Sequence, residues 1–397
     1  MKQKRFFYIL AIIVMILASF KIFNNNAVFE ENNNLVEEKT KSIEKNIDKV
    51  KITLVGDLLF EQPFYNVVEN GYDRNVYFSK VSNYFEEDDL TIGNMEVVIG
   101  NDSMKVSGEG YNFCAPKWVG DLVSSQSFEV LSTSNNHAFD RGVEGINSTI
   151  DYFKNTNIKT VGTRKSEDDS FLLYLEKNNI KFGITSYTYG TNQKNSNRYM
   201  VNYYKDESGN INKEQIKNDI DELKKSSDVV IVLIHWGLEF RYNQSEEQKN
   251  LAKYLNELGV DIIVGSHSHN ISPMEVIESS NKKTLVYYSM GNFVSHDDDI
   301  ARTPQGDEEF DNAYQVGLLS TLNITKENDI ISIEDIKTEI IVNYFDSNMQ
   351  NFMLIPFHEY SEEYEKSHLR YNKGLTKEFI KNMYNNVIDE SFRTTYE

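Results

Sequence analysis

The sequence predicts an α/β domain, because short apolar runs of strand length alternate with segments of helical periodicity. The runs, for example 52–55 and 229–234, are continuous rather than alternating, which is typical of strands buried on both faces. Several of these apolar runs are followed directly by a short stretch that contains polar residues. The 397-residue chain is 40% hydrophobic and 12% aromatic, so it can fill a sizeable core.

The N-terminal segment has the pattern of a signal-anchor. Lys2, Lys4 and Arg5 precede an apolar run from Phe6 to Phe20. This run is long enough for a signal-peptide core or a short membrane span, and no clear small-x-small cleavage site follows it. The positive residues favour an orientation with the bulk of the chain outside the cytoplasm. We therefore expect residues 1–23 to be a single-pass anchor in the cell membrane, with a cleaved signal peptide as the alternative.

The remaining chain divides into three expected regions. Residues 24–50 are polar and asparagine-rich, which predicts a linker. Residues 51–345 carry the strand and helix patterns and form the predicted main domain. Within it, 322–341 predicts two β-strands joined by a charged turn. Residues 346–397 are charged and predict a helical C-terminal extension.

Polar side chains gather where the predicted strands end. The strands are expected at 52–55, 90–92, 130–131, 229–234, 262–264 and 285–288. The residues that follow five of them are Asp57, Asn94 and Glu96, Asn136 and His137, His235, and His267 and His269. Four of the seven histidines of the chain lie in these short stretches. Because ligands of open α/β sheets bind beyond the carboxyl ends of the strands, we expect these side chains to meet.

Two helices between the strands are clearly marked. One begins at Ser245, where Gln248 three positions later completes a capping-box pattern. Leucines at helical spacing follow, and Gly259 ends the pattern. The other helix is expected at 143–153.

Charge and cysteine content exclude two classes of protein. The net charge is −20 and no dense Lys/Arg cluster occurs, which argues against a nucleic-acid partner. The single cysteine, Cys114, cannot form an intramolecular disulfide. A small buried residue is its expected role, and a thiol nucleophile is the alternative.

The strand-end residues suit a divalent metal. Histidine nitrogens with carboxylate or amide oxygens are ligands for Mn, Fe or Zn. Asp57 and Glu96 are able to bridge two ions, and two adjacent ions can clamp the oxygens of a phosphoryl transfer. The sequence contains no P-loop, nucleophile elbow or Rossmann glycine pattern. It therefore predicts a site for one or two divalent ions.

The motifs occur in a recognisable order. They are Gly56-Asp57, Asn94-Met95-Glu96, Phe113 with Ala115-Pro116, Asn135-Asn136-His137 with Asp140 and Gly142, His235-Trp236-Gly237 with Glu239, Gly265-x-His267-x-His269, and Tyr288-Ser289-Met290-Gly291-Asn292-Phe293. Over about Ile52 to Ser295 this order resembles the CapA family of poly-γ-glutamate capsule biosynthesis proteins, within the calcineurin-like metallophosphoesterase superfamily. The resemblance implies a sandwich of two β-sheets flanked by helices.

The resemblance also implies a role for each site residue. Asp57 and His269 would bind a first ion, and Asn136, His235 and His267 a second, with Glu96 or Asn94 in the bridging position. His137 would act as general acid on the leaving group or stabilise the phosphoryl oxygens. Asp140 and Glu239 are candidates for orienting the histidines. We therefore expect His137 and Asp140 in the catalytic apparatus.

One departure from the superfamily pattern concerns the first motif. Typical metallophosphatases carry Asp-x-His there, whereas this chain has Asp57-Leu58-Leu59. The usual second aspartate motif is replaced by Asn-x-Glu. Both changes weaken the first ion's site, so one ion, two loosely held ions, or binding without hydrolysis are all compatible with the sequence. CapA-like sequences commonly share these changes.

Every candidate also has a purely structural interpretation. Asp57 can cap a helix, Asn94 and Glu96 can end a solvated strand, Asn136 can be a turn residue, and His137 and His235 can be packed core histidines. This interpretation is weakest for His267 and His269, which are separated by a small residue. His296 is expected in a solvated loop rather than a cation site. Gly291-Asn292 is expected to be a structural turn rather than a ligand.

The resemblance implies a membrane-anchored protein that acts in capsule synthesis or export. Its expected partners are membrane components of a synthesis complex and the polyanionic polymer. A phosphoesterase acting on an envelope glycan or lipid-carrier phosphate is the alternative, and a structural or adhesion module is a third possibility.

Overall fold

The computed structural model describes residues 47–396 except 111, 281 and 299–307, together with the isolated positions Met15 and Lys21. The chain divides into two units, Met1–Ile47 and Asp48–Glu397. Apart from Met15 and Lys21, the expected anchor at 1–23 lies outside the described residues, as does most of the linker at 24–50. The last four residues of that linker are not loop but the start of the first strand. No helix among the described residues is both long and apolar enough to cross a membrane.

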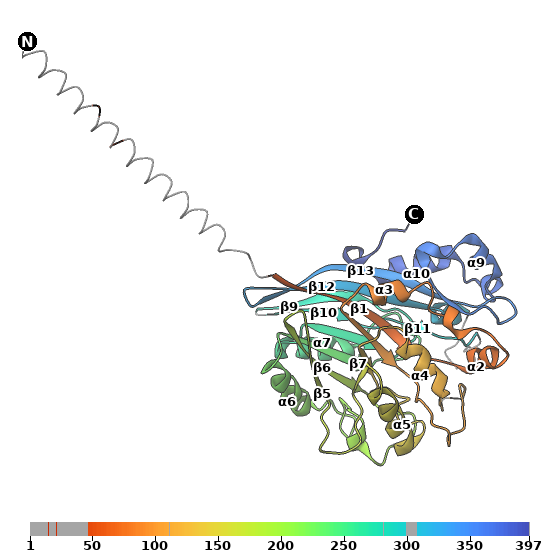
Figure 1. Ribbon diagram of the computed structural model, residues 1–397, viewed down its shortest axis with the longest axis horizontal. Coiled ribbons are helices and arrows are strands. Elements are labelled where there is room, and N and C mark those ends of the chain that lie inside the picture. Colours follow the sequence, from red (N-terminus) through yellow and green to blue (C-terminus); the bar gives the residue numbers. More distant parts are fainter. Residues whose placement is uncertain are drawn as a thin grey trace, which may run out of the picture. The chain divides into compact units, whose positions relative to one another are not determined.

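Two β-sheets form the framework of the second unit (Figure 1). The first sheet has the order β14 (Met353–Pro356), β13 (Ile330–Tyr344), β12 (Val316–Glu327), β1 (Ile47–Leu58), β2 (Leu90–Met95), β3 (Val130–Ser132) and β4 (Lys159–Val161), with β11 (Asn292–Val294) also paired to β1. The second has the order β5 (Leu172–Lys177), β6 (Ile180–Thr188), β7 (Val229–His235), β8 (Ile262–Ser266), β10 (Lys282–Tyr287) and β9 (Met274–Ser279). The central strands β1 to β4, and β6, β7, β8 and β10, are parallel.

The described α-helices connect and flank these sheets. They are α2 (Gln62–Glu69), α3 (Ser82–Glu86), α4 (Lys117–Ser124), α5 (Gly142–Lys154), α6 (Lys213–Lys224), α7 (Glu246–Leu258), α8 (Glu308–Tyr314), α9 (Glu362–Ser367) and α10 (Lys377–Val387). Helices therefore accompany both sheets, as the resemblance implies.

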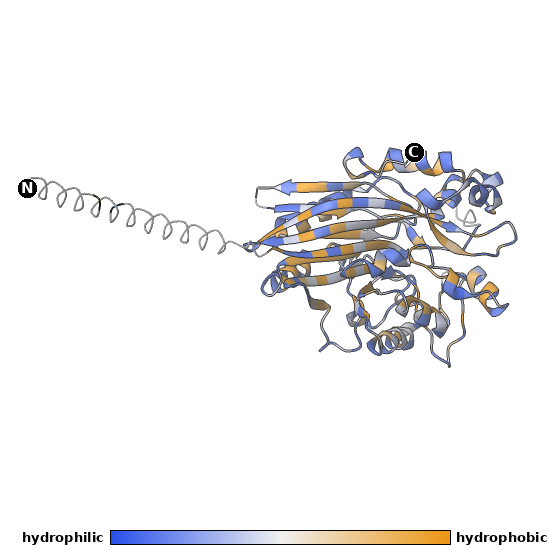
Figure 2. Cartoon of the chain, turned by 45° about the horizontal axis from the view of Figure 1, so that its top comes forward, coloured by the Kyte–Doolittle hydropathy of each residue, from blue (hydrophilic) through white to orange (hydrophobic). Residues whose placement is uncertain are grey.

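The two sheets pack against each other through a shared apolar core. Ile52 and Leu54 of β1 belong to the same buried cluster as Ile231 and Leu233 of β7. Side chains of a strand point alternately to its two faces, so the intervening residues of β7 face outward. Val230, Val232 and Ile234 pack there in a second cluster with buried residues of α6 and α7. Figure 2 shows hydrophobic residues recurring along the strands of both sheets.

The clearest sequence predictions are confirmed. The capping box of α7 is formed by two hydrogen bonds, from Gln248 N to Ser245 Oγ (3.2 Å) and from Ser245 N to Gln248 Oε1 (2.8 Å). Gly259 ends the helix with φ of 97°. The six predicted strands all occur, as does the pair at 322–341, which lies within β12 and β13. The long strand β6 was not predicted.

The C-terminal segment 346–397 combines helices with a strand. It contains α9 and α10, and also β14, which pairs antiparallel with β13. Ile380 and Met383 of α10 belong to the same buried cluster as Ile340 of β13. The segment is thus part of the same compact unit as the main domain.

Candidate metal centre

Parallel strands of both sheets end at one place and bring the predicted side chains together. Asp57 lies near the end of β1, in register with Asn94 of β2. Glu96 follows β2 directly, and His235 is the last residue of β7, in register with Ser266 of β8. Parallel neighbours end on the same edge of a sheet, so the alignment of strands fixes the alignment of these side chains.

Two glycines permit the close backbone contacts that this convergence needs. A Cβ atom on Gly56 would lie 2.0 Å from the carbonyl oxygen of Gly291, and one on Gly265 would lie 2.2 Å from that of Tyr288. The amide of Asp57 donates to the same Gly291 oxygen at 3.0 Å. Any side chain at either glycine would push the strand ends apart and displace the acidic and histidine residues that follow.

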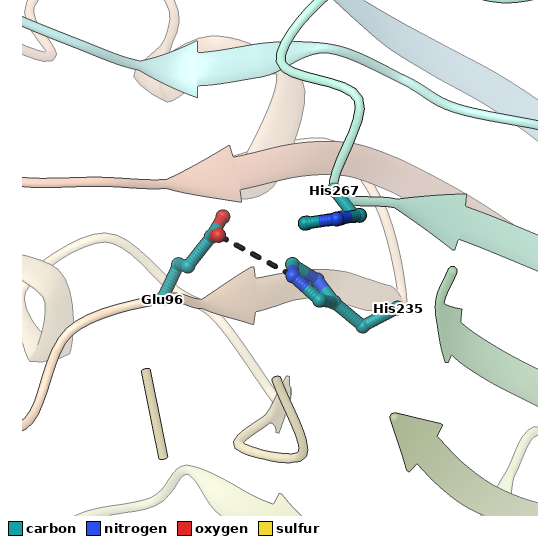
Figure 3. Close-up of side chains that lie close together, drawn as sticks. All are labelled: Glu96, His235 and His267. Carbon is teal, nitrogen blue, oxygen red and sulfur yellow. Dashed lines mark ion pairs between the residues drawn. The ribbon is translucent and has the colours of Figure 1, made fainter. Parts of the chain in front are cut away.

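Three overlapping groups of side chains have the spacing of metal ligands. They are Glu96 with His235 and His267, Asp57 with Glu96 and His269, and Glu239 with His267 and His269. Within each group, one ligand atom from each residue lies within 4.8 Å of the others. Figure 3 shows the Glu96 carboxylate facing the rings of His235 and His267. Glu96, His267 and His269 each belong to two groups, and Glu96 is the one of the three whose side chain offers two oxygens, which favours it for the bridging position.

Several buried polar atoms in this cluster lack a hydrogen-bond partner within the described residues. They are both carboxylate oxygens of Glu96, Nδ1 of His267 and Nδ2 of Asn136. Buried polar groups are normally satisfied, so a set of orphaned atoms in one place calls for an explanation. A divalent cation would satisfy the oxygens and the histidine nitrogen, and the donor set of imidazole and carboxylate fits Mn, Fe or Zn.

The electrostatics of the cluster agree with a cation site. Burial lowers the pKa of His235 and His267 well below their ordinary value, and the neighbouring histidines lower it further. Both rings are therefore neutral, as metal coordination requires. Burial raises the pKa of Glu96 and Asp57, and for Glu96 the charge of Asp57 adds to the effect. A bound cation would offset this cost of keeping the carboxylates charged.

Hydrogen bonds orient the candidate ligands. His235 Nδ1 lies 2.8 Å from Ser266 Oγ, and its Nε2 lies 2.9 Å from Asn136 Oδ1 and 3.4 Å from Glu96 Oε1. His269 Nδ1 lies 3.0 Å from Oδ1 of Asn292. Such contacts fix ring orientation and the proton position on the opposite nitrogen.

The two asparagines of the predicted ligand set have different surroundings. Asn94 donates from Nδ2 to Asp57 Oδ1 at 2.7 Å, and its Oδ1 accepts from Asn135 at 3.2 Å. Both ends of its amide are thus engaged with protein groups, and its contact with Asp57 helps to orient that carboxylate. Asn136, by contrast, turns Oδ1 toward His235, beside the first ligand group.

His267 and His269 both have positive φ, of 97° and 58°. This conformation is unfavourable for residues with a side chain, and it persists where the surrounding structure demands it. Here it turns two side chains that are two residues apart toward one another, with ring centroids 6.2 Å apart. Local strain is therefore concentrated where the candidate ligands lie.

His137 and Asp140 form a buried pair at the edge of this cluster. His137 Nδ1 lies 2.7 Å from Asp140 Oδ2, which also accepts the amide of Phe113 at 2.6 Å. His137 lines a cavity of ≈ 340 Å³ together with His269 and Glu239. Asp140 thus orients a histidine whose other face lies at a cavity shared with the candidate ligands.

Leu59 and Glu239 also line this cavity. Leu59, at the position of the superfamily histidine, is apolar and buried, so it offers no ligand. Glu239 forms no hydrogen bond to a histidine within the described residues, so the structure gives no support for the orienting role expected for it. It belongs instead to the third ligand group.

Three residues of the site were not predicted from the sequence. The ring of Tyr189 lies 4.7 Å from that of His267 and packs parallel to that of His235. Nδ2 of Asn192 lies 3.4 Å from Nε2 of His137. Both residues follow β6, so recognising that strand would have revealed a sixth strand end at the site. Asn292, expected as a structural turn, lies in β11 and contacts His269.

The expectation of a solvated loop at His296 is wrong. His296 is buried and packs parallel to the ring of Phe64, with centroids 4.6 Å apart. Its backbone amide donates to Glu61 Oε2 at 2.6 Å, and Glu61 N donates to its Nδ1 at 3.3 Å. Apolar packing and this pairing with a distant buried carboxylate outweigh the polar local sequence. Cys114 is buried, as expected.

Two packed sheets with flanking helices and a histidine–carboxylate cluster at the strand ends define a metallophosphoesterase-like protein. The family model described as "Bacterial capsule synthesis protein PGA_cap" matches residues 51–297. The chain therefore belongs to the bacterial capsule synthesis family PGA_cap, which includes the CapA proteins.

Two curated relatives support the family. The PGA biosynthesis protein CapA of Bacillus subtilis (strain 168) is 30% identical over 254 residues, which are 62% of this chain and 63% of that protein. The capsule biosynthesis protein CapA of Bacillus anthracis is 27% identical over 259 residues, which are 62% of this chain and 60% of that protein. The similarity thus spans less than two thirds of either relative.

A solved structure, described as a novel phosphatase from Mycoplasma pneumoniae, aligns with 75% of this chain and 94% of its own, at 14% identity and a TM-score of 0.44. This similarity is too low to bear on activity.

Proposed function

We propose that this protein acts in the synthesis or export of poly-γ-glutamate or a similar capsule polymer, as a membrane-anchored, extracytoplasmic protein with a divalent-metal centre. Membership of the capsule synthesis family and the printed names of the two Bacillus relatives support the process. The observation that supports the metal centre is the meeting of Glu96, His235 and His267, with no hydrogen-bond partner for the Glu96 oxygens among the residues that the structure describes.

The metal would also explain how an acidic protein handles an acidic polymer. The chain carries a net charge of −20, which repels polyanions. A divalent ion at the cavity reverses the local field and can accept a polymer carboxylate as a further ligand. The other partners we propose are membrane components of a synthesis complex, held near the protein by its N-terminal segment.

Polymer binding in the presence and absence of metal tests this proposal. Full-length protein loaded with Mn²⁺ is expected to bind poly-γ-glutamate, and EDTA treatment is expected to weaken that binding. His267→Ala should bind the polymer as weakly as the EDTA-treated wild type. Binding that survives both EDTA and the substitution would contradict the role of the metal.

A second candidate function is phosphoester hydrolysis, which the His137–Asp140 pair favours. His137 lines the same cavity as His269, and Asp140 fixes its ring. A histidine in this position can donate a proton to a leaving oxygen. A metal bound to the neighbouring cluster would supply an activated water and stabilise phosphoryl oxygens. An envelope glycan or lipid-carrier phosphate is the substrate class we propose for this activity.

Turnover of a generic phosphodiester in Mn²⁺ tests the enzymatic candidate. The wild-type chain is expected to hydrolyse it, and His267→Ala to be inactive because the metal is lost. Activity retained in His267→Ala would show that the hydrolysis arises elsewhere.

A further inference from the structure

Glu239 is an unpartnered carboxylate beside the candidate metal centre. It follows β7 in the segment His235–Phe240 and is half-buried. A carboxylate oxygen of Glu239 and one ring nitrogen each of His267 and His269 lie within 4.8 Å of one another. Within the described residues, Glu239 forms no hydrogen bond or ion pair. A carboxylate oxygen and two imidazole nitrogens at this spacing, with no described protein group paired to the carboxylate, have the composition of a ligand set for a divalent cation.

The backbone fixes Glu239 in this position. Trp236 N donates to Ser266 O at 3.3 Å, and Phe240 N donates to Ser268 O at 2.9 Å. Residues on both sides of Glu239 are thus tied to the segment that carries His267 and His269. Phe240 packs near the ring of His269, with centroids 6.1 Å apart. The carboxylate therefore reaches the two histidines from a rigid support rather than from a free loop.

The group that contains Glu239 overlaps with the other two ligand groups through His267 and His269. His267 belongs to the group of Glu96 and His235, and His269 to the group of Glu96 and Asp57. In the third group, Glu239 lies beside both His267 and His269, and Glu96 is not a member of that group. It also lines the cavity, whereas Glu96 and His235 do not. Glu239 thus lies on the cavity side of the cluster.

We propose that Glu239 is a direct metal ligand that closes the cavity side of this centre. The proposal rests on the metal centre proposed above and adds a ligand to it. An ion next to Glu239 would be offered the Glu239 carboxylate oxygen and one ring nitrogen each of His267 and His269. A mixed set of imidazole and carboxylate suits Mn, Fe or Zn. Because Glu239 and His269 both line the cavity, this ion would lie on the cavity side of the cluster.

Mn²⁺ titration of the full-length protein by calorimetry tests the proposal, with bound metal counted by elemental analysis. Glu239→Gln preserves size and removes the charge, so it should weaken one class of Mn²⁺ site by at least about tenfold. Glu109→Gln is the matched control, because Glu109 lines the same cavity, is exposed, and belongs to none of the three ligand groups. This control should bind Mn²⁺ like the wild type.

Two outcomes would overturn the assignment. The first is a Glu239→Gln variant that matches the wild type in affinity and stoichiometry. The second is a Glu109→Gln variant that binds as weakly as Glu239→Gln, which would indicate a general charge effect. The visible spectrum of the Co²⁺-loaded protein provides a second readout, since loss of a direct ligand changes the metal's absorption bands. Wild-type protein that binds no ion would instead refute the metal centre itself, so the two failures are distinguishable.

Discussion

Oε1 of Glu96 lies 3.4 Å from Nε2 of His235, and both side chains are buried at the meeting point of two different sheets. Neither oxygen of this carboxylate has a hydrogen-bond partner in the described part of the chain. An unsatisfied buried carboxylate is costly unless a cation pairs with it. The pair is therefore the strongest structural sign of a candidate cation site at these strand ends.

Glu96→Gln should change stability in opposite directions with and without metal. Burial and the charge of Asp57 raise the pKa of Glu96, so the metal-free wild type loses stability as pH rises from about 4.5 through that raised value. The glutamine variant has no carboxyl group to ionise at this position, so at pH 8 in EDTA it should have a larger free energy of unfolding, relative to pH 5, than the wild type has. With Mn²⁺ at 100 times its Kd, only the wild type should gain about 2.7 kcal/mol.

Urea unfolding at pH 5 and pH 8, in EDTA and in Mn²⁺, measures both effects. Equal stabilisation of wild type and Glu96→Gln by Mn²⁺ would show that Glu96 is not a ligand.

Asp140→Asn should separate metal binding from proton transfer. Asp140 contacts His137 at 2.7 Å but belongs to none of the three ligand groups. The variant is expected to keep the metal content of the wild type. If the protein hydrolyses phosphodiesters, kcat should fall by about 10²–10⁴-fold, because His137 loses the partner that orients it. Steady-state kinetics and elemental analysis of the same preparation provide the two readouts, and loss of metal would contradict the separation.

Glu61→Gln should remove a pH-dependent part of the stability. Burial, with a contribution from the charge of Asp297, raises the pKa of Glu61 from 4.5 to about 8. A raised folded-state pKa contributes stability below pH 4.5 that is lost as pH rises through about 8. Between pH 4.5 and pH 9 the wild type should therefore lose up to about 5 kcal/mol relative to the variant.

The amide of the variant can keep the contacts of Glu61. Its oxygen can accept the amides of His296 and Asp297, and its nitrogen can donate to Tyr314 Oη, which now donates to Glu61 Oε1 at 2.9 Å. Denaturant unfolding across this pH range is the measurement. Parallel stability curves for wild type and variant would show that Glu61 is charged in the folded protein.

The strand-end residues could be predicted because the signals are local. The apolar run before Asp57 and the one before His235 each define a strand, and parallel strands bring their ends together. The capping box at Ser245 is likewise contained in four consecutive residues. The order of such motifs along the chain is sufficient to indicate the family.

The contacts between distant segments could not be predicted in this way. Glu61 and His296 are 235 positions apart, and nothing in either local sequence indicates that they pair. Tyr189 and Asn192 were missed because β6 has Gly183 and a lysine within its apolar run, which weakened the strand pattern. The hydrogen bonds of Asn94 with Asp57 and Asn135, which distinguish its surroundings from those of Glu96, are likewise seen only in the folded chain.

Elemental analysis of the purified full-length protein tests the central claim most directly, with the His267→Ala/His269→Ala double variant as comparison. After incubation with Mn²⁺ or Zn²⁺ and removal of free metal, the wild type should retain one or two ions per chain, and the double variant should retain none while keeping its circular dichroism spectrum. A wild-type chain without metal, or a double variant that retains as much as the wild type, would contradict a metal centre at the strand ends.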